Sequence, residues 1–415
     1  MLSPFGKRQA RVPNLNNTKA KDSKASSRVE DVLASNKPTE ANPVAALAKD
    51  ELWWCDHFQW LKELGYLLRP RYAPGWVPSW QNTKKKVVSL RRCTNTLGKF
   101  SAFVTIATYW DWNYFVQYPH LLDATRIADG SYVTLKVIKQ SRHPFEADIG
   151  RYFSSGPIAD DPANHCVPIY EFIEVPGEVD KIIMVMPLLR LYDDPHFDTF
   201  GEAVECFRQL FEGLQFMHKH RVAHRDCMNL NIMMDASSLY IDAFHPYDPD
   251  MRRDFKGEAR HRSRTQCPPK YFFIDFGISR RYDPGDEAPL EDPIWGGDKT
   301  VPEFQRSIEP QNPFYTDIYY IGNVIREDFI QGKSGFEFMI PLVADMVQDD
   351  PVKRPSMDEV VARFNILRKD LSTWKLRSRV IDREDDETSG LFSNIAHWTR
   401  RVIFIIRRIP PVPTS

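Results

Sequence analysis

The sequence has little glycine, with 19 residues in 415 against 31 prolines. Glycine lets backbone amides approach phosphate groups with no Cβ atom in the way, so this shortage is unusual for a protein that cradles phosphates on a flexible loop. The chain also has no excess of either charge, because 55 Lys and Arg residues face 56 Asp and Glu residues. That balance argues against a protein dominated by nucleic-acid phosphate contacts, which would be strongly basic.

Long apolar runs and paired cysteines are absent as well. The run at 402–406 is far shorter than the ~20 apolar residues of a membrane span, and no apolar signal-peptide stretch opens the chain. The six cysteines lie far apart, with no CxxC pair. This spacing favours reduced thiols over a disulfide framework or a zinc site, so we expect a cytoplasmic protein, with the nucleus as the alternative.

The first hundred residues divide into two segments. Residues 1–48 contain one aromatic residue and many Lys, Ser, Asn and Ala, so they are predicted to be a disordered tail. Residues 49–100 are predicted to be an N-terminal extension. Within it Trp54, Phe58 and Leu61 recur at helical spacing, which predicts a helix with an aromatic face.

The hydrophobic periodicity changes along the rest of the chain. Residues 131–138 are β-branched and apolar after an Asp-Gly turn, and further strands are expected at 166–174 and 181–188. From Thr199 onward the period is helical. Later helices are expected at 315–330, 336–348 and 356–370. Strands that precede helices in this way predict an α+β fold in two lobes.

Two short motifs carry the chemistry. The first is His224-Arg225-Asp226, with Asn231 five positions after the aspartate, and the second is an Asp-Phe-Gly sequence that begins at Asp275. At about one in twenty per position, a pattern of four fixed residues occurs by chance in well under one chain in a hundred of this length. Two such motifs in this order make coincidence negligible.

The motifs resemble the catalytic loop and the metal-binding motif of the eukaryotic protein kinase superfamily. The resemblance covers about residues 100–372 and is greatest to a divergent group of kinase-like proteins of mushroom-forming fungi. It implies a bilobal protein-kinase-like fold with a small β-rich N-lobe and a larger helical C-lobe. The implied ranges are 101–189 for the N-lobe, 190–375 for the C-lobe with an insertion at about 236–270, and 376–415 for a C-terminal tail.

The resemblance also implies roles for single residues, with ATP and Mg²⁺ as cofactors. Asp226 would accept the proton of the acceptor hydroxyl, with Arg225 beside it, and Asn231 and Asp275 would hold Mg²⁺ through oxygen atoms. Lys136 would contact the α- and β-phosphates. Glu146 would pair with that lysine, and Asp148 is the alternative partner.

Further matches concern the adenine site and the C-lobe scaffold. Met186 would be the gatekeeper, and Leu189 would supply the hinge donor because Pro187 has no N–H. Glu303 resembles the end of the activation segment and would form a buried pair with Arg354. Asp317 resembles the aspartate that anchors the catalytic loop.

Several positions depart from the family pattern. The glycine-rich phosphate loop should fall near 114–119, but no glycine occurs between Gly98 and Gly130. Met228 replaces the lysine that reaches the transferred phosphate in Ser/Thr kinases, and Gly296 replaces a threonine that acts with it. These changes weaken the Ser/Thr assignment without indicating Tyr specificity.

Other features leave alternatives open. The insertion at 236–270 is predicted to be a surface loop that binds a partner. Arg225 has two candidate partners, a phosphate on the activation segment (at Ser279, Tyr282 or Thr300) or an acidic side chain of the run 286–292. Cys227 is interpreted as a buried apolar thiol rather than a redox switch.

The C-terminal tail is rich in arginine and aliphatic residues. A helix packed on the body, or a frayed end, is favoured there, and an interfacial membrane helix is the alternative. For the whole chain, the favoured function is transfer of the ATP γ-phosphate to a protein hydroxyl, with Ser/Thr preferred over Tyr. The alternatives are a pseudokinase that acts as a nucleotide-binding or scaffold module, and phosphorylation of a small molecule.

Overall fold

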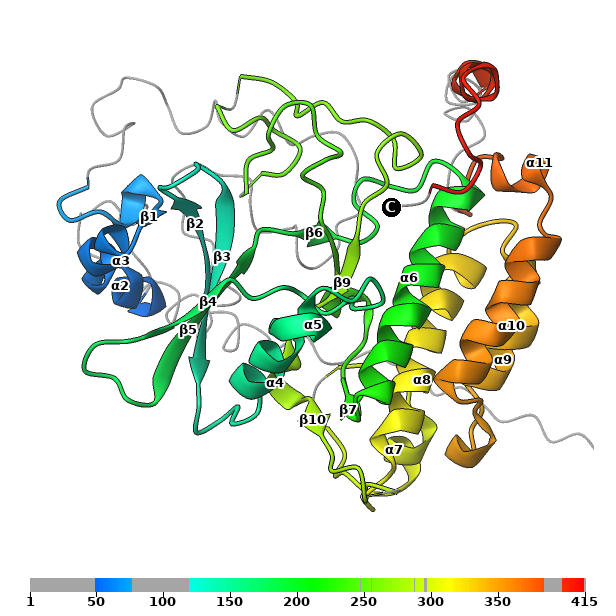
Figure 1. Ribbon diagram of the computed structural model, residues 1–415, viewed down its shortest axis with the longest axis horizontal. Helices are drawn as coiled ribbons and strands as arrows, with labels where there is room; N and C mark the ends of the chain where they lie inside the picture. Colours follow the sequence, from blue (N-terminus) through cyan, green and yellow to red (C-terminus); the bar gives the residue numbers. More distant parts are fainter. Residues whose placement is uncertain are drawn as a thin grey trace, which may run out of the picture.

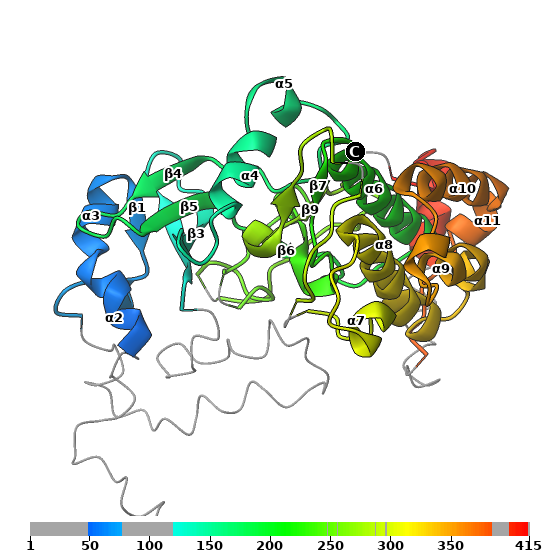
Figure 2. The ribbon, with the colours of Figure 1, turned by 90° about the horizontal axis from the view of Figure 1, so that it is seen from below.

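The computed structural model describes residues 49–76, 119–383 apart from 247, 255, 287, 295 and 296, and 398–413. The predicted tail at 1–48, positions 114–118 of the expected phosphate loop, and Gly296 lie outside the described residues. The described chain has an α+β fold, with an antiparallel sheet at one end and most helices at the other (Figure 1). The same division is visible from below (Figure 2), and it is compatible with a bilobal fold.

Five antiparallel strands form the larger sheet, in the order β1-β2-β3-β5-β4. They are β1 (Tyr66–Leu68), β2 (Leu121–Arg126), β3 (Tyr132–Lys139), β4 (Glu171–Glu174) and β5 (Lys181–Pro187). The strand expected at 166–174 is shorter than predicted, because only its second half pairs with β5.

Strand β1 moves the start of the sheet into the segment that the sequence sets apart as an extension. The β-rich lobe is predicted to begin at residue 101, but Leu68 lies opposite Ala124 of β2. A three-residue edge strand is too short to show a period of its own, so its pairing emerges only in three dimensions. The connection between β1 and β2 therefore spans residues 69–120.

Two short helices, α2 (Lys49–Asp56) and α3 (Phe58–Glu63), cover one face of this sheet (Figure 1). The predicted aromatic face is confirmed, since Trp54, Phe58 and Leu61 are all buried. They share a hydrophobic cluster with side chains of β2, β3 and β5. Because strand side chains alternate between faces, the intervening residues of β3 and β5 point toward the helical part.

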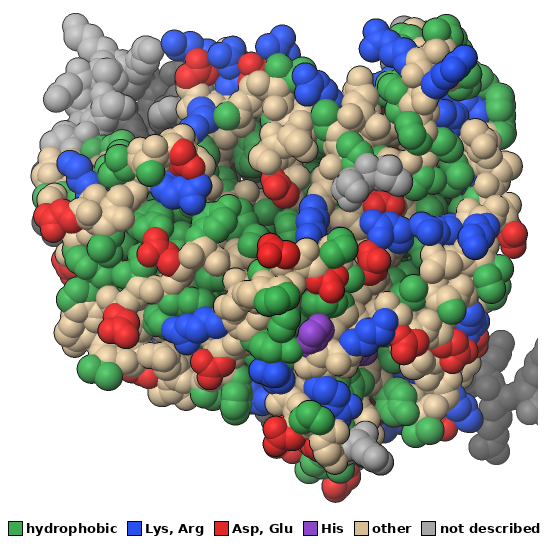
Figure 3. Space-filling view, in the orientation of Figure 1, with side chains coloured by type: hydrophobic (Ala, Val, Ile, Leu, Met, Phe, Trp, Pro, Cys, Tyr) green, Lys and Arg blue, Asp and Glu red, His purple; other side chains and the backbone are tan. Residues whose placement is uncertain are grey.

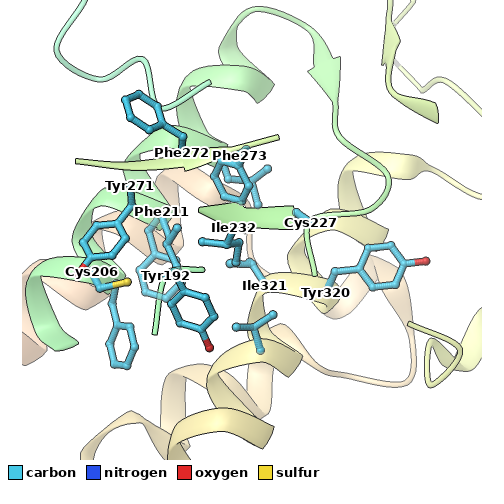
Figure 4. Packing of buried hydrophobic residues seen from close by; sticks show 14 of the residues in the cluster. Tyr192, Cys206, Phe211, Cys227, Ile232, Tyr271, Phe272, Phe273, Tyr320 and Ile321 are labelled. Carbon is cyan, nitrogen blue, oxygen red and sulfur yellow. The ribbon is translucent and has the colours of Figure 1, made fainter. Parts of the chain in front are cut away.

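The helical part is built around α6 (Phe200–Lys219), which begins with a capping box. The Thr199 hydroxyl accepts a hydrogen bond from the Glu202 amide, and the Glu202 carboxylate accepts one from the Thr199 amide. These bonds satisfy backbone donors that a helix start leaves open, which is why the helix starts where the period changes. Figure 4 shows side chains of α6, β8, β9 and α8 meeting in one layer of the core.

The remaining elements follow in chain order. The helices are α4 (Glu146–Phe153), α5 (Gly156–Ala159), α7 (Pro302–Arg306), α8 (Pro313–Val324) with a π-helical continuation (Ile325–Gln331), α9 (Ile340–Met346), α10 (Met357–Asp370) and α11 (Thr373–Leu376). The short 3₁₀ turns are η1 (Pro70–Tyr72), η3 (Asn229–Asn231), η4 (Phe276–Ile278), η6 (Glu337–Met339) and η7 (Pro351–Lys353).

Two small sheets lie between the larger sheet and the helices. One has the order β6-β8-β9, from β6 (Arg190–Leu191), β8 (Ile232–Met234) and β9 (Tyr271–Phe273). The other pairs β7 (Val222–Ala223) with β10 (Arg280–Arg281). Residues 398–406 are helical too. Within the described ranges, every helix is too short or too polar to cross a membrane.

A buried ion pair fixes the lower part of the helical region. Both guanidinium nitrogens of Arg354 contact the carboxylate of Glu303, at 2.8 and 2.6 Å. The two side chains are 3% and 7% exposed, and Arg354 also donates to the carbonyls of Gln348 and Tyr315. Removing one partner would leave the other charge buried without compensation.

We therefore predict that Arg354→Met lowers the free energy of unfolding by roughly 3–5 kcal/mol, as measured by urea denaturation. The matched control is Arg306→Ala, because Arg306 pairs with Asp349 on the surface, where both side chains are well over half exposed. That variant should lose less than about 1 kcal/mol. Equal losses in the two variants would contradict the structural role given to the buried pair.

Candidate functional site

A cavity of about 590 Å³ lies where the larger sheet meets the small sheet β6-β8-β9. Six of the predicted site residues line it, namely Lys136, Met186, Leu189, Asp226, Asn231 and Asp275. The other two predicted residues lie outside this lining: Glu146 contacts Lys136, and Arg225 precedes Asp226 in the chain. The two sequence motifs, about fifty residues apart, therefore converge on one cleft.

At the centre of the cleft, the Lys136 ammonium lies between two carboxylates. Its Nζ atom is 2.5 Å from Glu146 Oε1 and 2.8 Å from Asp275 Oδ1. Lys136 and Glu146 are 6% and 1% exposed. Asp148, the alternative partner, is exposed and pairs with Arg151 instead.

The charges of Lys136 and its carboxylate neighbours shift the pKa values of the cluster. Burial acts to lower the pKa of Lys136, but the carboxylates of Asp275 and Glu146 outweigh it, and the pKa is raised. Partial burial likewise acts to raise the pKa of Asp275, but the Lys136 ammonium prevails and lowers it to about 2. Both groups therefore remain charged at neutral pH.

The loop after β7 is held from below by Asp317 of α8. The carboxylate of Asp317 accepts hydrogen bonds from the backbone amides of His224 and Arg225, at 2.8 and 2.7 Å. Arg225 has a left-handed backbone with φ of 69°. The two hydrogen bonds therefore fix a backbone conformation that residues other than glycine rarely adopt. The anchoring role expected for Asp317 is thus matched by its contacts.

Cys227, next in the loop, is fully buried, and its thiol donates to the Asp317 carbonyl. Burial raises the pKa of this thiol well above its usual range. A buried thiol with so little thiolate is a poor redox switch.

Asp226 and Asn231 face each other across the turn η3. The Asn231 amide nitrogen donates to the backbone carbonyl and to Oδ2 of Asp226, both at 2.8 Å. Oδ1 of Asp226 is buried and has no hydrogen-bond partner in the described part of the chain. Burial, with smaller contributions from Asp275, Asp317 and Asp298, raises the pKa of Asp226 to about 7.

Gly297 packs directly against this carboxylate. Its φ is +71°, and a Cβ atom built on it would lie 2.3 Å from Oδ1 of Asp226. Any other residue would therefore clash with Asp226 and strain the backbone. Gly297 is not among the predicted site residues, although the Gly-Gly pair at 296–297 is a signal in a chain with so little glycine.

The far end of the cleft has the features expected of a hinge. Met186, 7% exposed, lies opposite Thr134 in the β3–β5 pairing. Pro187 has no N–H, and the Leu188 N–H donates to the Tyr132 carbonyl at 3.4 Å. Leu189, which lines the cavity, is therefore the first hinge residue whose amide is a candidate donor for a ligand.

Two residues that line the cleft have side-chain oxygen atoms of the kind that holds a metal ion. Asp275 supplies a carboxylate, and Asn231, whose amide nitrogen is engaged by Asp226, supplies an amide oxygen. The described residues contain no cluster of three or more His, Cys, Asp or Glu side chains that could hold a metal. This small set fits Mg²⁺, which proteins commonly bind through one or two side chains together with substrate phosphates.

Arg225 is occupied by an acidic side chain. It lies 3.1 Å from Glu291 Oε2 and donates to the carbonyls of Ile278 and Asp292. Of the two partners considered for Arg225, the structure contains the acidic one. Ser279, a candidate phosphosite, is fully buried and donates to the His224 carbonyl.

The insertion at 236–270 packs more deeply than the expected surface loop. Leu239 is fully buried and Arg264 is 2% exposed. The Arg264 guanidinium lies over the Phe197 ring at 4.2 Å and donates to the Tyr192 carbonyl. Arg264 lies in the segment predicted to be a surface loop, but the aromatic face and the carbonyl compensate its burial.

The insertion also forms one wall of the cleft, through Phe244, Pro246 and Pro249. Arg190 of β6 holds it there by donating to the Pro249 carbonyl at 2.6 Å and by lying 5.1 Å from the Phe244 ring. At the other end, Arg253 donates to the Gly130 carbonyl and covers the Tyr132 ring at 3.7 Å. The insertion thus reaches from the helical part to the β2–β3 turn.

Comparison with known proteins assigns no relative. A scan against protein-family models finds no match to the chain, and neither does a search of curated proteins. The functional interpretation therefore depends on the sequence motifs and on the geometry of the cleft.

Because its folded pKa is raised, Asp226 should make stability depend on pH. An unfolded aspartate has a pKa of about 3.9, so below that pH the carboxyl is protonated in both states and costs the folded protein no stability. Between about pH 4 and about 7 the cost to the free energy of unfolding increases, and above about 7 it is complete. Asp226→Asn should therefore be more stable than the wild type near about pH 8, by at most about 4 kcal/mol, and the gain should vanish near about pH 4.

Urea denaturation at several pH values measures this difference. Asp148→Asn is the matched control, because its carboxylate is 76% exposed. A gain for Asp226→Asn that does not vary with pH, or a loss near about pH 8, would contradict the environment described for Asp226.

Arg190 should hold the insertion against the cleft. We predict that Arg190→Ala increases the rate of chymotrypsin cleavage within residues 240–260 severalfold in the folded protein, because the Pro249 and Phe244 contacts are lost. Arg260→Ala is the control, since the Arg260 side chain is exposed and pairs with Asp242. Unchanged cleavage in Arg190→Ala would show that other contacts fix the insertion.

Proposed function

We propose that this protein is a divergent member of the eukaryotic protein kinase superfamily that transfers the ATP γ-phosphate to a protein hydroxyl. The observation that carries the proposal is the convergence of Lys136, Asp226 and Asp275 on one cleft, with Glu146 behind the lysine. The α+β division is compatible with a bilobal kinase fold, in which the cleft lies between the lobes.

Each residue has a separate task in this mechanism. The Lys136 ammonium, oriented by Glu146, would bind phosphate oxygens, while Asp275 and Asn231 would hold Mg²⁺. Bound Mg²⁺ neutralises phosphate charge and orients the transferred group. Asp226 would hydrogen-bond the acceptor hydroxyl and accept its proton.

Ser/Thr acceptors are preferred over Tyr in this proposal. Met228 lines the cleft where Ser/Thr kinases carry a lysine, so the charge on the transferred phosphate would be balanced without that side chain. The protein would then depend more heavily on Lys136 and Mg²⁺ than Ser/Thr kinases that carry this lysine do.

The alternative function is a pseudokinase that binds a nucleotide or serves as a scaffold. Two observations favour it: no glycine occurs between Gly98 and Gly130, where a phosphate loop is expected, and Met228 stands in place of a lysine. A scaffold does not need the complete set of kinase residues, so their retention favours the enzyme; they are Lys136, Glu146, Asp226, Asn231 and Asp275.

Incubation of the full chain with γ-labelled ATP and Mg²⁺ distinguishes the two functions. We expect autophosphorylation in the wild type, none above background in Asp275→Ala, and a rate about 10²- to 10⁴-fold lower in Asp226→Asn. The wild-type rate should increase with pH through about 7, because Asp226 acts in its ionised form.

Thermal stabilisation by Mg²⁺–ATP provides the second measurement. If Mg²⁺–ATP stabilises the wild type but no labelled phosphate is incorporated, the protein is a nucleotide-binding pseudokinase and not an enzyme. Absence of both label and stabilisation would leave a scaffold.

A further inference from the structure

The helix at 398–406 touches the rest of the molecule along one narrow side. Arg401 and Phe404 are buried there, and Arg400 pairs with Asp198. The other apolar side chains face solvent, with exposed fractions of 49% for Trp398, 48% for Val402, 40% for Ile403, 52% for Ile405 and 74% for Ile406. In Figure 1 this helix, in red, stands at an outer corner of the molecule beside α11.

Three of these side chains share one face. Trp398, Val402 and Ile405 follow the i, i+4, i+7 spacing of a helical stripe, and Ile406 borders it. A contiguous apolar surface of this kind is rare on a soluble protein unless something binds to it.

The charged side chains of the helix itself are all basic. Residues 388–415 contain no Asp or Glu, and Arg407 and Arg408 at the end of the helix are exposed. Arg401 lies between two indole rings, 3.6 Å from that of Trp374 and 4.9 Å from that of Trp398. Figure 3 shows Lys, Arg and hydrophobic side chains together at this corner.

The exposed apolar face and the arginines together indicate which kind of surface could cover the helix. A second copy of the chain packed face to face would place arginines against arginines, which is unfavourable. A nucleic acid would satisfy the arginines but leave the isoleucines in contact with phosphates. A lipid bilayer with anionic head groups satisfies both sets, since aliphatic side chains enter the acyl boundary and arginine and tryptophan lie at the head groups.

We infer that the C-terminal helix docks this protein on an anionic membrane surface. Trp398, Val402 and Ile405 would insert, while Arg407 and Arg408 would contact lipid phosphates. The helix would lie in the plane of the interface, with its buried side still packed on the body. This inference goes beyond the proposed kinase function and does not depend on it.

Vesicle sedimentation with the full chain tests the inference. The probes are vesicles of phosphatidylcholine alone and of phosphatidylcholine with about a third phosphatidylserine. We expect binding to the anionic vesicles at least about tenfold tighter than to the neutral ones, and weaker in high salt. The double variant Arg407→Ala with Arg408→Ala should lose about fivefold for each arginine.

Substitution of the apolar face tests the inserted side chains. Ile405→Asp combined with Ile406→Asp should abolish vesicle binding, while Val179→Asp should leave it unchanged, because Val179 is 96% exposed on the β4–β5 connection. All of these side chains are exposed, so thermal melting should be the same as in the wild type and exclude unfolding as the cause.

Three results would overturn the inference. They are no binding of the wild type to anionic vesicles, equal binding to neutral and anionic vesicles, or equal binding of the isoleucine double variant. Self-association that the same double variant abolishes, without vesicle binding, would assign the helix to a second copy instead.

Discussion

The position of the Lys136 ammonium is the constraint on which the cleft depends. A lysine that is 6% exposed is stable as a cation only beside negative charge, and Glu146 and Asp275 supply it from two different segments. The ion cluster therefore joins β3, α4 and the chain after β9. Any change that separates these segments would leave a buried charge without a partner, so the cluster couples the arrangement of the cleft to its stability.

Asp226, in the same cleft, has a pKa shifted in the opposite direction from that of Asp275. Lys136 keeps Asp275 ionised, whereas burial, with smaller contributions from nearby carboxylates, raises the pKa of Asp226 to about 7. The two aspartates thus have well-separated pKa values within one cavity. Such a separation of pKa values is what distinguishes a metal ligand from a proton acceptor in known active sites.

The elements with strong local signals were predictable from the sequence. The helix after Thr199, the α10 range and the aromatic face of α2 and α3 all follow from spacing alone. Strand β1 was not predictable, because three residues at a sheet edge gain their structure from a partner far along the chain.

The same distinction applies to the site. The two motifs identified Asp226, Asn231 and Asp275, and further matches to the kinase family identified Lys136, Met186 and Leu189, because each match is local in sequence. The contribution of the insertion, the contact of Gly297 with Asp226 and the pairing of Glu291 with Arg225 depend on long-range packing, which no local pattern encodes. The most direct test of the central claim is therefore calorimetric titration of Mg²⁺–ATP into the full chain and into Lys136→Met. The account predicts binding to the wild type and at least about tenfold weaker binding to the variant, whereas equal affinities would contradict it.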